Sequence, residues 1–197
     1  MYVVDDDELI CRALSRLLRS AGLEARTFPS ARAFIDSPPL DRPACLVLDV
    51  RLPGPNNGLD LQSTLVQARP DIPIVFLTGY GSVPSSVRAM KGGAVDFLEK
   101  PFNDRQLLEC VQRGLALSVA LRASRTEREE LQSRFDKLTP RERAVLKLVV
   151  AGRLNKQIAD DLGSAEKTVK VHRGRVMQKM QADSVASLVR MTERLGL

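Results

Sequence analysis

The chain has 197 residues, a net charge of +6, 44% hydrophobic residues and no tryptophan. This length allows one large domain or two small ones. No apolar run is long enough to cross a bilayer, and the acids after Val3-Val4 do not fit a signal peptide, so we expect a soluble cytoplasmic protein without a membrane partner. Three cysteines in apolar surroundings, Cys11, Cys45 and Cys110, are expected to be buried free thiols and not a disulfide or zinc site.

The first half of the chain alternates between short apolar runs and helical stretches. The runs Tyr2–Val4, Cys45–Leu48, Ile74–Leu77 and Phe97–Leu98 are typical of strands that are buried on both faces. After the first run, an amphipathic helix ends at Gly22, and its predicted apolar face consists of Leu9, Ile10, Ala13, Leu14, Leu17 and Leu18. The alternation predicts a doubly wound parallel α/β sheet.

A polar side chain follows each of these runs. Asp5 and Asp6 follow the first run, Asp49 the second, Thr78 the third and Lys100 the fourth. Because the carboxyl ends of parallel strands share one edge, we expect these side chains to lie together at a ligand site. Three crowded carboxylates repel one another unless a cation lies among them, and oxygen ligands with water suit Mg²⁺. The hydroxyl and the ammonium would complete a pocket for a phosphoryl group.

This set of residues, in this order, resembles the receiver domain of bacterial two-component response regulators. The stretches Thr78-Gly79-Tyr80-Gly81, Ala89-Met90-Lys91, Gly93-Ala94-Val95-Asp96-Phe97 and Lys100-Pro101-Phe102 resemble its FixJ-type branch. The resemblance implies a five-stranded flavodoxin/CheY-like fold and a cis peptide bond at Lys100-Pro101.

The resemblance also assigns roles to individual residues. Asp49 is implied as the phosphoacceptor, and Mg²⁺ or Mn²⁺ is implied as the cofactor. The implied metal ligands are Asp5, Asp6, Asp49 and the backbone carbonyl of Arg51. Thr78 and Lys100 are implied to bind the phosphoryl group, and Phe97 to act as an aromatic switch. The alternatives are that a single aspartate such as Asp7 only starts a helix, and that Phe97 is an ordinary core residue.

The loop after Asp49 departs from the family pattern. From Asp49 to Gly58 the chain has one residue more than the usual loop, and Asn57-Gly58 is typical of a turn. The extra residue follows Arg51, so we expect the metal-binding carbonyl to be kept. The insertion is expected to change the rate of phosphorylation and the lifetime of the phosphoryl group, but not the ability to be phosphorylated.

From about Asp104 to Pro140 the sequence is helical in pattern. A final helix of the first domain is predicted to pack through Leu107, Leu108, Val111, Leu115 and Val119. A broken heptad leaves a coiled coil as an alternative for the next stretch; it consists of Leu117, Leu121, Leu131, Phe135 and Leu138. We expect a receiver domain at 1–117, a helical linker at 118–135 and an all-α domain of four helices at 136–197.

Basic side chains are concentrated in this last part. Residues 136–197 carry 13 basic and 7 acidic side chains, whereas residues 1–110 have a net charge of −2. The distribution favours a polyanionic partner, although a basic solvated surface is a common alternative.

Helix boundary signals are clear in the carboxyl-terminal domain. Thr139-Pro140 begins a helix with a capping box to Glu142, and Gly152 ends it. Asn155 is predicted to cap a second helix, 156–162, which Gly163 ends. A third helix is predicted at about 166–180 and a fourth at about 184–194. A short helix, a tight turn and a longer basic helix are typical of a helix-turn-helix.

Three segments resemble the LuxR/NarL-type DNA-binding domain, namely Leu138–Glu142, Asn155–Ala159 and Lys167–Arg173. The family's usual serine cap before the third helix is Ala165 here, and we expect Ser164 to cap the helix instead. His172 is the only histidine, which excludes a multi-histidine metal site.

The third helix has two predicted faces. The inward face consists of Val169, His172, Val176 and Met180. The opposite stripe, which can enter a major groove, consists of Lys167, Lys170, Val171, Gly174 and Gln178. Arg173, Arg175 and Lys179 flank this stripe and suit phosphates. The predicted DNA contacts come from the stripe, from its flanks and from the start of the second helix; they are Lys167, Lys170, Val171, Gly174, Arg173, Arg175, Lys179, Thr168, Asn155 and Lys156. Gly174 either allows close approach to DNA or is merely tolerated, since a glycine inside a helix costs about 1 kcal/mol.

The two resemblances imply a transcription regulator that a sensor histidine kinase phosphorylates on Asp49. Phosphorylation is expected to change the surface near Ser85–Lys91 and Val95–Leu98, to favour a homodimer and to strengthen binding to promoter DNA, with RNA polymerase as a further partner. One alternative is an orphan regulator that binds DNA without phosphorylation. The other is a metal-dependent phosphohydrolase, although the second acid that such enzymes need two residues after the nucleophile is Arg51 here.

Overall fold

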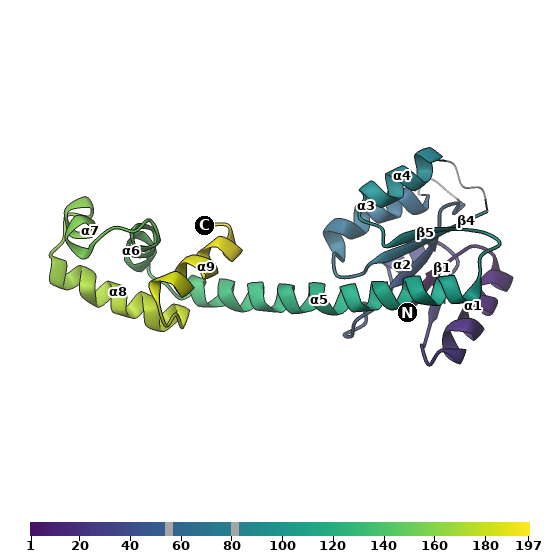
Figure 1. Ribbon diagram of the computed structural model, residues 1–197, viewed down its shortest axis with the longest axis horizontal. Coiled ribbons are helices and arrows are strands. Elements are labelled where there is room, and N and C mark those ends of the chain that lie inside the picture. Colours follow the sequence, from purple (N-terminus) through teal and green to yellow (C-terminus); the bar gives the residue numbers. More distant parts are fainter. Residues whose placement is uncertain (54–56, 80–82) are drawn as a thin grey trace. The chain divides into compact units, whose positions relative to one another are not determined.

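The computed structural model describes residues 1–53, 57–79 and 83–197 (Figure 1). It divides the chain into two units, Met1–Ala123 and Ser124–Leu197. The one-residue insertion was predicted near Pro55–Asn57; of that segment Pro55 and Asn56 lie outside the described residues, as do Tyr80 and Gly81. Among the described helices, none is both long enough and apolar enough to span a membrane.

The first unit is built on a parallel sheet of five strands in the order β2-β1-β3-β4-β5. The strands are β1 (Tyr2–Val4), β2 (Arg26–Phe28), β3 (Leu46–Asp49), β4 (Ile74–Thr78) and β5 (Asp96–Glu99). The predicted doubly wound sheet is therefore confirmed. Strand β2 lies at the edge, where Arg26 and Thr27 are exposed, so it lacks the apolar run that marks the other strands.

Two apolar clusters cover the two faces of this sheet. The helices are α1 (Glu8–Ser20), α2 (Ala31–Ile35), α3 (Gly58–Ala68), α4 (Val83–Lys91) and α5 (Asp104–Asp136). Val4 and Leu48 point to a cluster with side chains of α2, α3 and α4, whereas Val3 and Val47 point to a cluster with α1 and α5. The three cysteines are buried and free, as expected, and all belong to the second cluster.

Helix α1 begins where Asp7 caps it. The Asp7 carboxylate accepts hydrogen bonds from the backbone N–H groups of Leu9 and Ile10, which confirms the reading of Asp7 as a cap. The predicted apolar face was partly wrong, because the side chain of Leu9 is 73% exposed and Ala13 is also exposed. The buried face is narrower and consists of Cys11, Leu14 and Leu18.

Helix α5 continues through the unit boundary, and a polar contact holds it to the first unit. Val119 was predicted to be buried but is 54% exposed, and the neighbouring Ser118 is buried instead. The Ser118 hydroxyl donates to the carbonyl of Asp71 at 2.7 Å and accepts from the N–H of Ala44 at 3.1 Å. Arg122 pairs with the carboxylates of Asp71 and Asp41. Contacts with the first unit thus extend beyond the predicted boundary at residue 117, while the boundary itself stays a prediction.

Replacing Ser118 with alanine should lower the stability of the first unit. The change leaves a buried N–H of Ala44 without its acceptor, which costs about 1–2 kcal/mol in the free energy of unfolding. Urea denaturation of the full chain, followed by far-UV circular dichroism, measures this loss. Arg105→Ala is the control, because Arg105 lies on the same helix in an exposed pair with Glu109. Equal stability of the two variants would contradict the role of Ser118.

The second unit contains the end of α5 and four further helices. These are α6 (Pro140–Val150), α7 (Asn155–Asp161), α8 (Glu166–Met180) and α9 (Val185–Leu195). Their apolar faces form one core, which Leu131, Phe135 and Leu138 join. The guanidinium of Arg143 lies 4.7 Å from the centre of the Phe135 ring. The heptad-like residues therefore belong to two different units, since Leu117 and Leu121 lie in the first one.

The helix ends of the second unit correct two predicted caps. The capping box of Thr139 and Glu142 is present, as predicted. Asn155 is not a cap but the first residue of α7, because Leu154 holds the cap position and donates its N–H to Gln157. Ser164 does not cap α8 either: Ala165 is the cap residue, and no side-chain hydrogen bond supports it.

Candidate functional site

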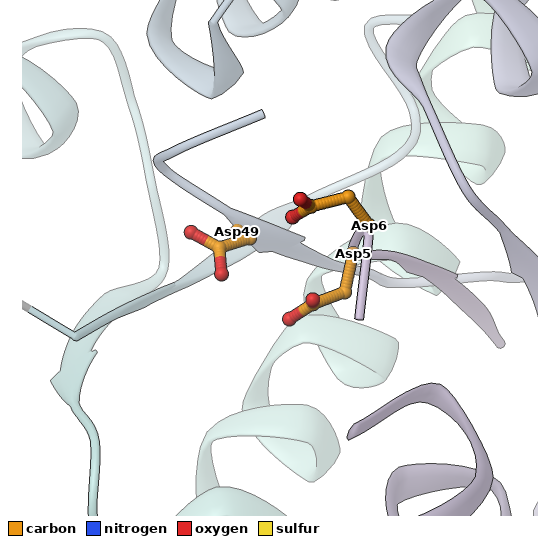
Figure 2. Close-up of side chains that lie close together, drawn as sticks. All are labelled: Asp5, Asp6 and Asp49. Carbon is orange, nitrogen blue, oxygen red and sulfur yellow. The ribbon is translucent and has the colours of Figure 1, made fainter. Parts of the chain in front are cut away.

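Three aspartates meet at one edge of the sheet, as Figure 2 shows. Asp5 and Asp6 follow β1, and Asp49 ends β3. These strands are neighbours in parallel register, with Val4 opposite Leu48, so Asp5 lies next to Asp49. One ligand oxygen from each aspartate lies within 4.8 Å of the others. Asp5 and Asp49 are buried, and Asp6 is exposed.

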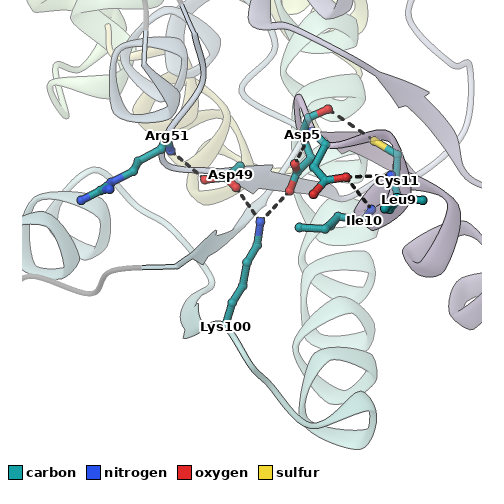
Figure 3. Close-up of polar contacts among 8 residues, drawn as sticks. Asp5, Leu9, Ile10, Cys11, Asp49, Arg51 and Lys100 are labelled. Carbon is teal, nitrogen blue, oxygen red and sulfur yellow. Dashed lines mark hydrogen bonds and ion pairs between the residues drawn. The ribbon is translucent and has the colours of Figure 1, made fainter.

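Lys100 reaches this cluster from the end of β5. Its ammonium lies 2.7 Å from Oδ2 of Asp5 and 2.6 Å from Oδ2 of Asp49 (Figure 3). The backbone fixes the base of this long side chain, since the Lys100 N–H donates to the carbonyl of Thr78 at 2.7 Å. The peptide bond between Lys100 and Pro101 is cis, as expected. A single cation therefore bridges the two buried carboxylates.

Backbone donors hold the remaining oxygens of these carboxylates. The N–H of Arg51 donates to Oδ1 of Asp49 at 2.7 Å, and the N–H of Asp7 donates to Oδ1 of Asp5 at 2.9 Å. Each of the two carboxyl groups is thus oriented by a backbone N–H of its own and by the shared ammonium of Lys100. The side chain of Arg51 is exposed, and the metal-binding role of its carbonyl stays a prediction.

Burial and charge act in opposite directions in this pocket. Burial raises the pKa of Asp5, although Lys100 and the N–H of Asp7 oppose the rise. Burial alone would lower the pKa of Lys100, but hydrogen bonds with Asp49 and Asp5 outweigh it and raise that pKa. Lys100 is therefore charged at neutral pH, and its ammonium pairs with two of the three clustered carboxylates. Such a donor set, with Asp6 open to water, suits a hard divalent cation that keeps part of its hydration shell.

Helix α3 begins in direct contact with the backbone of Asp49. A Cβ atom on Gly58 would lie 2.3 Å from the carbonyl oxygen of Asp49, so only glycine fits there. Asn57 caps the helix by accepting from the N–H groups of Leu59 and Asp60. The sequence indicated a turn at Asn57-Gly58, whereas the structure shows a capped helix start. The importance of Gly58 was missed, and the asparagine before an apolar stretch was the available signal.

The two predicted switch residues differ in their surroundings. Thr78 ends β4 and is completely buried. Phe97 lies on β5, half-buried against one core cluster, with its ring centre 6.2 Å from that of Phe76. This packing fits the alternative of an ordinary core aromatic, and a switch role for Phe97 stays a prediction.

Helix α8 of the second unit has the two predicted faces. Val169, Val176 and Met180 are buried, and His172 is half-buried. The opposite stripe is exposed along its whole length and consists of Lys167, Lys170, Val171, Gly174 and Gln178. We call this set the α8 stripe. Thr168 and Arg175, and Lys156 at the start of α7, are also exposed.

Lys179 has a structural contact that the sequence did not indicate. Its ammonium lies 2.7 Å from Oε2 of buried Glu142 and 3.1 Å from the carbonyl of Lys137. This ion pair joins α8 to α6 and argues against Lys179 as a phosphate contact. Arg173 donates to Oδ1 of Asn155 at 3.0 Å and links α8 to α7. Arg175 is therefore the better candidate for a phosphate contact.

The ion pair of Glu142 should make the second unit sensitive to acid. Burial would raise the pKa of Glu142, but hydrogen bonds from Lys179 and from the N–H of Thr139 outweigh it and lower that pKa. A lowered pKa in the folded state adds stability above the pKa of the unfolded state. This stability is lost as the pH falls through the lowered pKa of the folded state, which lies below the ordinary range of a glutamate.

Glu142→Gln tests this expectation, since glutamine keeps the capping box but not the charge. The melting temperature of the full chain should be lower in this variant at neutral pH, and the difference from the parent should shrink on acidification. Glu166→Gln, at an exposed position of α8, is the control and should follow the parent. A constant difference between parent and Glu142→Gln at every pH would refute the ion pair's contribution.

Comparisons with known proteins agree with both parts of the chain. Residues 1–112 match the model of the response regulator receiver domain, and residues 136–192 match that of the bacterial regulatory proteins of the luxR family. Nodulation protein W of Bradyrhizobium diazoefficiens is 51% identical over 197 residues, which cover 100% of this chain and 86% of that protein. Transcriptional regulatory protein FixJ of the same organism is 40% identical over 197 residues, or 100% of this chain and 96% of that protein.

Solved structures show the same likeness. The response regulator StyR has a TM-score of 0.80 and 46% identity, with 98% of this chain and 97% of that chain covered. Full-length FixJ from B. japonicum has a TM-score of 0.58 and 40% identity, with 99% and 96% covered. The chain thus belongs to the two-component response regulators of the FixJ type, and it is a transcriptional regulator with a receiver domain and a LuxR-type DNA-binding domain.

Proposed function

We propose that a sensor histidine kinase phosphorylates this regulator on Asp49 and that phosphorylation favours dimerisation and promoter binding. The observation that carries the proposal is the position of Lys100, whose ammonium bridges the carboxylates of Asp5 and Asp49. A cation fixed beside a buried carboxylate can pair with a phosphoryl group once Asp49 carries it.

The chemistry is a transfer to a carboxylate oxygen. An Oδ atom of Asp49 forms the new bond to phosphorus while the bond from phosphorus to the kinase histidine breaks, and the imidazole keeps the electron pair. Lys100 then pairs with a phosphoryl oxygen, and the hydroxyl of Thr78 contacts another. Mg²⁺ or Mn²⁺, held by Asp5, Asp6, Asp49 and the Arg51 carbonyl, would neutralise the charge that gathers in the pocket.

Asp6→Ala should weaken the binding of Mg²⁺ to the unphosphorylated chain. The site offers few protein ligands, so affinity in the parent is expected to be weak and to depend on each carboxylate. Titration with Mg²⁺, followed by NMR shifts of the pocket amides, measures the effect. Asp7→Asn is the control, because asparagine also caps helices and Asp7 is the cap of α1. Equal affinity of Asp6→Ala and the parent would exclude Asp6 as a ligand.

We expect the surface for dimerisation to lie on α4, which contains the predicted segment Ser85–Lys91. Val83, Val87 and Met90 are 77%, 45% and 47% exposed, and their spacing puts them on one helix face. Phosphorylation would draw Thr78 towards the phosphoryl group and reorient Phe97, which shifts an existing equilibrium of this surface. A dimer would present two α8 stripes to a two-fold promoter site, where RNA polymerase is the further partner.

Phosphorylation with acetyl phosphate and Mg²⁺, followed by sedimentation analysis, tests the proposal. The phosphorylated chain should have the mass of a dimer, and the untreated chain that of a monomer. A monomer at complete phosphorylation would contradict the proposal. An orphan regulator, the alternative that the sequence left open, would instead bind promoter DNA equally well with or without the phosphoryl group.

A further inference from the structure

Gly174 lies inside α8, on the α8 stripe that the proposed function assigns to DNA. Lys170 and Val171 precede it by one helical turn, so the three positions share one face. Glycine inside a helix lowers helix stability relative to alanine, because its backbone loses more conformational freedom on folding. A glycine at this position is therefore expected where a neighbouring group leaves no space for a Cβ atom or where the backbone needs a positive φ.

The described part of the protein supplies no such reason. Gly174 is not among the described residues with positive φ, and a Cβ atom there would meet no heavy atom within 4 Å. The other glycines of the described ranges have a positive φ or a neighbour closer than 3.0 Å to the added Cβ, with one exception. This exception is Gly79, which directly follows Thr78 at the phosphorylation pocket. Gly174 differs from Gly79 in its place, since it lies inside a helix and on the exposed α8 stripe.

The neighbours of Gly174 indicate what the partner needs. Val171 is 48% exposed, and its short side chain can touch a base edge only if the helix lies deep in the groove. An apolar side chain of this kind suits the methyl group of thymine. Gly174 lies one turn after Val171 and has no Cβ atom. The helix backbone can therefore come closer to the bases at the floor of the groove.

We infer that Gly174 sets the depth of α8 in the major groove and thereby determines specificity without a side chain of its own. The inference rests on the proposed function, since it requires that the α8 stripe binds DNA. It assigns to Gly174 a close contact with the DNA and to Val171 the readout of a thymine methyl.

Gly174→Ala separates the two effects, because they have opposite signs. In the full chain, the melting temperature should rise, since alanine favours the helix and the space is open. Affinity for a duplex obtained by randomised-site selection with the parent should fall at least about tenfold, because the methyl group holds the helix away from the bases. The control is Thr126→Ala, an exposed helical position of the same unit outside α8. It should also raise the melting temperature but leave the affinity unchanged.

Deoxyuridine in place of each thymine of the selected duplex gives a second measurement. The parent should lose affinity where Val171 contacts a methyl group, and Gly174→Ala should lose less, because its helix lies farther out. If Gly174→Ala binds the selected duplex as tightly as the parent, or melts at a lower temperature, the inference is overturned while specific binding by the parent still supports the proposed function. If the parent itself selects no sequence, both fail.

Discussion

Replacing Asp49 with asparagine is expected to abolish phosphorylation of the chain. Asp49 is the acid that Lys100 and the N–H of Arg51 hold in place at the edge of the sheet. Asparagine has a similar shape, but its amide is a poor nucleophile, so the variant should fold and yet accept no phosphoryl group. Mass spectrometry after treatment with acetyl phosphate and Mg²⁺ should show one added phosphoryl group in the parent and none in Asp49→Asn.

Asp96→Asn is a suitable control for this experiment. Asp96 lies at the start of β5 and pairs with Arg113, away from the carboxyl edge of the sheet. This variant should be labelled like the parent. Undiminished labelling of Asp49→Asn would show that another residue is the phosphoacceptor, and the proposed chemistry would then be wrong.

Lys170→Ala and Arg175→Ala should weaken DNA binding in two different ways. Lys170 belongs to the α8 stripe, and its loss should cost about 1–3 kcal/mol on the cognate site and blur the preference at one base pair. Arg175 flanks the stripe and is exposed, so its loss should weaken binding to all sequences similarly and reduce the salt dependence. Lys179 is unsuitable for this test, because its ammonium pairs with Glu142 and its loss would also destabilise the domain.

Randomised-site selection with each variant, combined with affinity measurements at several salt concentrations, distinguishes the two roles. Altered preferences in Lys170→Ala and unchanged preferences in Arg175→Ala are the expected results. If both variants bound less tightly with unchanged preferences, α8 would act only as a basic surface, and sequence-specific reading by the α8 stripe would be refuted.

Local patterns predicted the features that depend on neighbours in the sequence. Apolar runs located β1, β3, β4 and β5, because a strand that is buried on both faces needs apolar residues throughout. The capping box of Thr139 and the two faces of α8 were also predicted, because both depend on the spacing of residues that are close together in the sequence. The edge strand β2 has no such run, since Arg26 and Thr27 face water.

Contacts between distant segments could not be predicted in this way. Periodicity placed Leu9 and Val119 in the core, but the neighbouring elements do not cover them. Ser118 is buried because it satisfies the backbone of two loops, at Ala44 and Asp71, which lie far from it in sequence.

The acidic pocket at the carboxyl edge of the sheet shows the same division between local patterns and distant contacts. The order of acids, threonine and lysine predicted that they gather at one edge, because parallel strands end there. The bridge from Lys100 to both Asp5 and Asp49, and the close contact of Gly58 with the backbone of Asp49, depend on the geometry of the folded sheet. In the DNA-binding domain, the pair of Lys179 with Glu142 likewise joins residues from two helices.

The affinity for promoter DNA before and after phosphorylation tests the central claim most directly. The same selected duplex is titrated with the untreated parent, with the parent treated with acetyl phosphate and Mg²⁺, and with Asp49→Asn treated in the same way. Treatment should strengthen binding by the parent and leave Asp49→Asn unchanged. Equal affinity of all three samples would contradict control by Asp49 and would identify a regulator that binds DNA independently of phosphorylation.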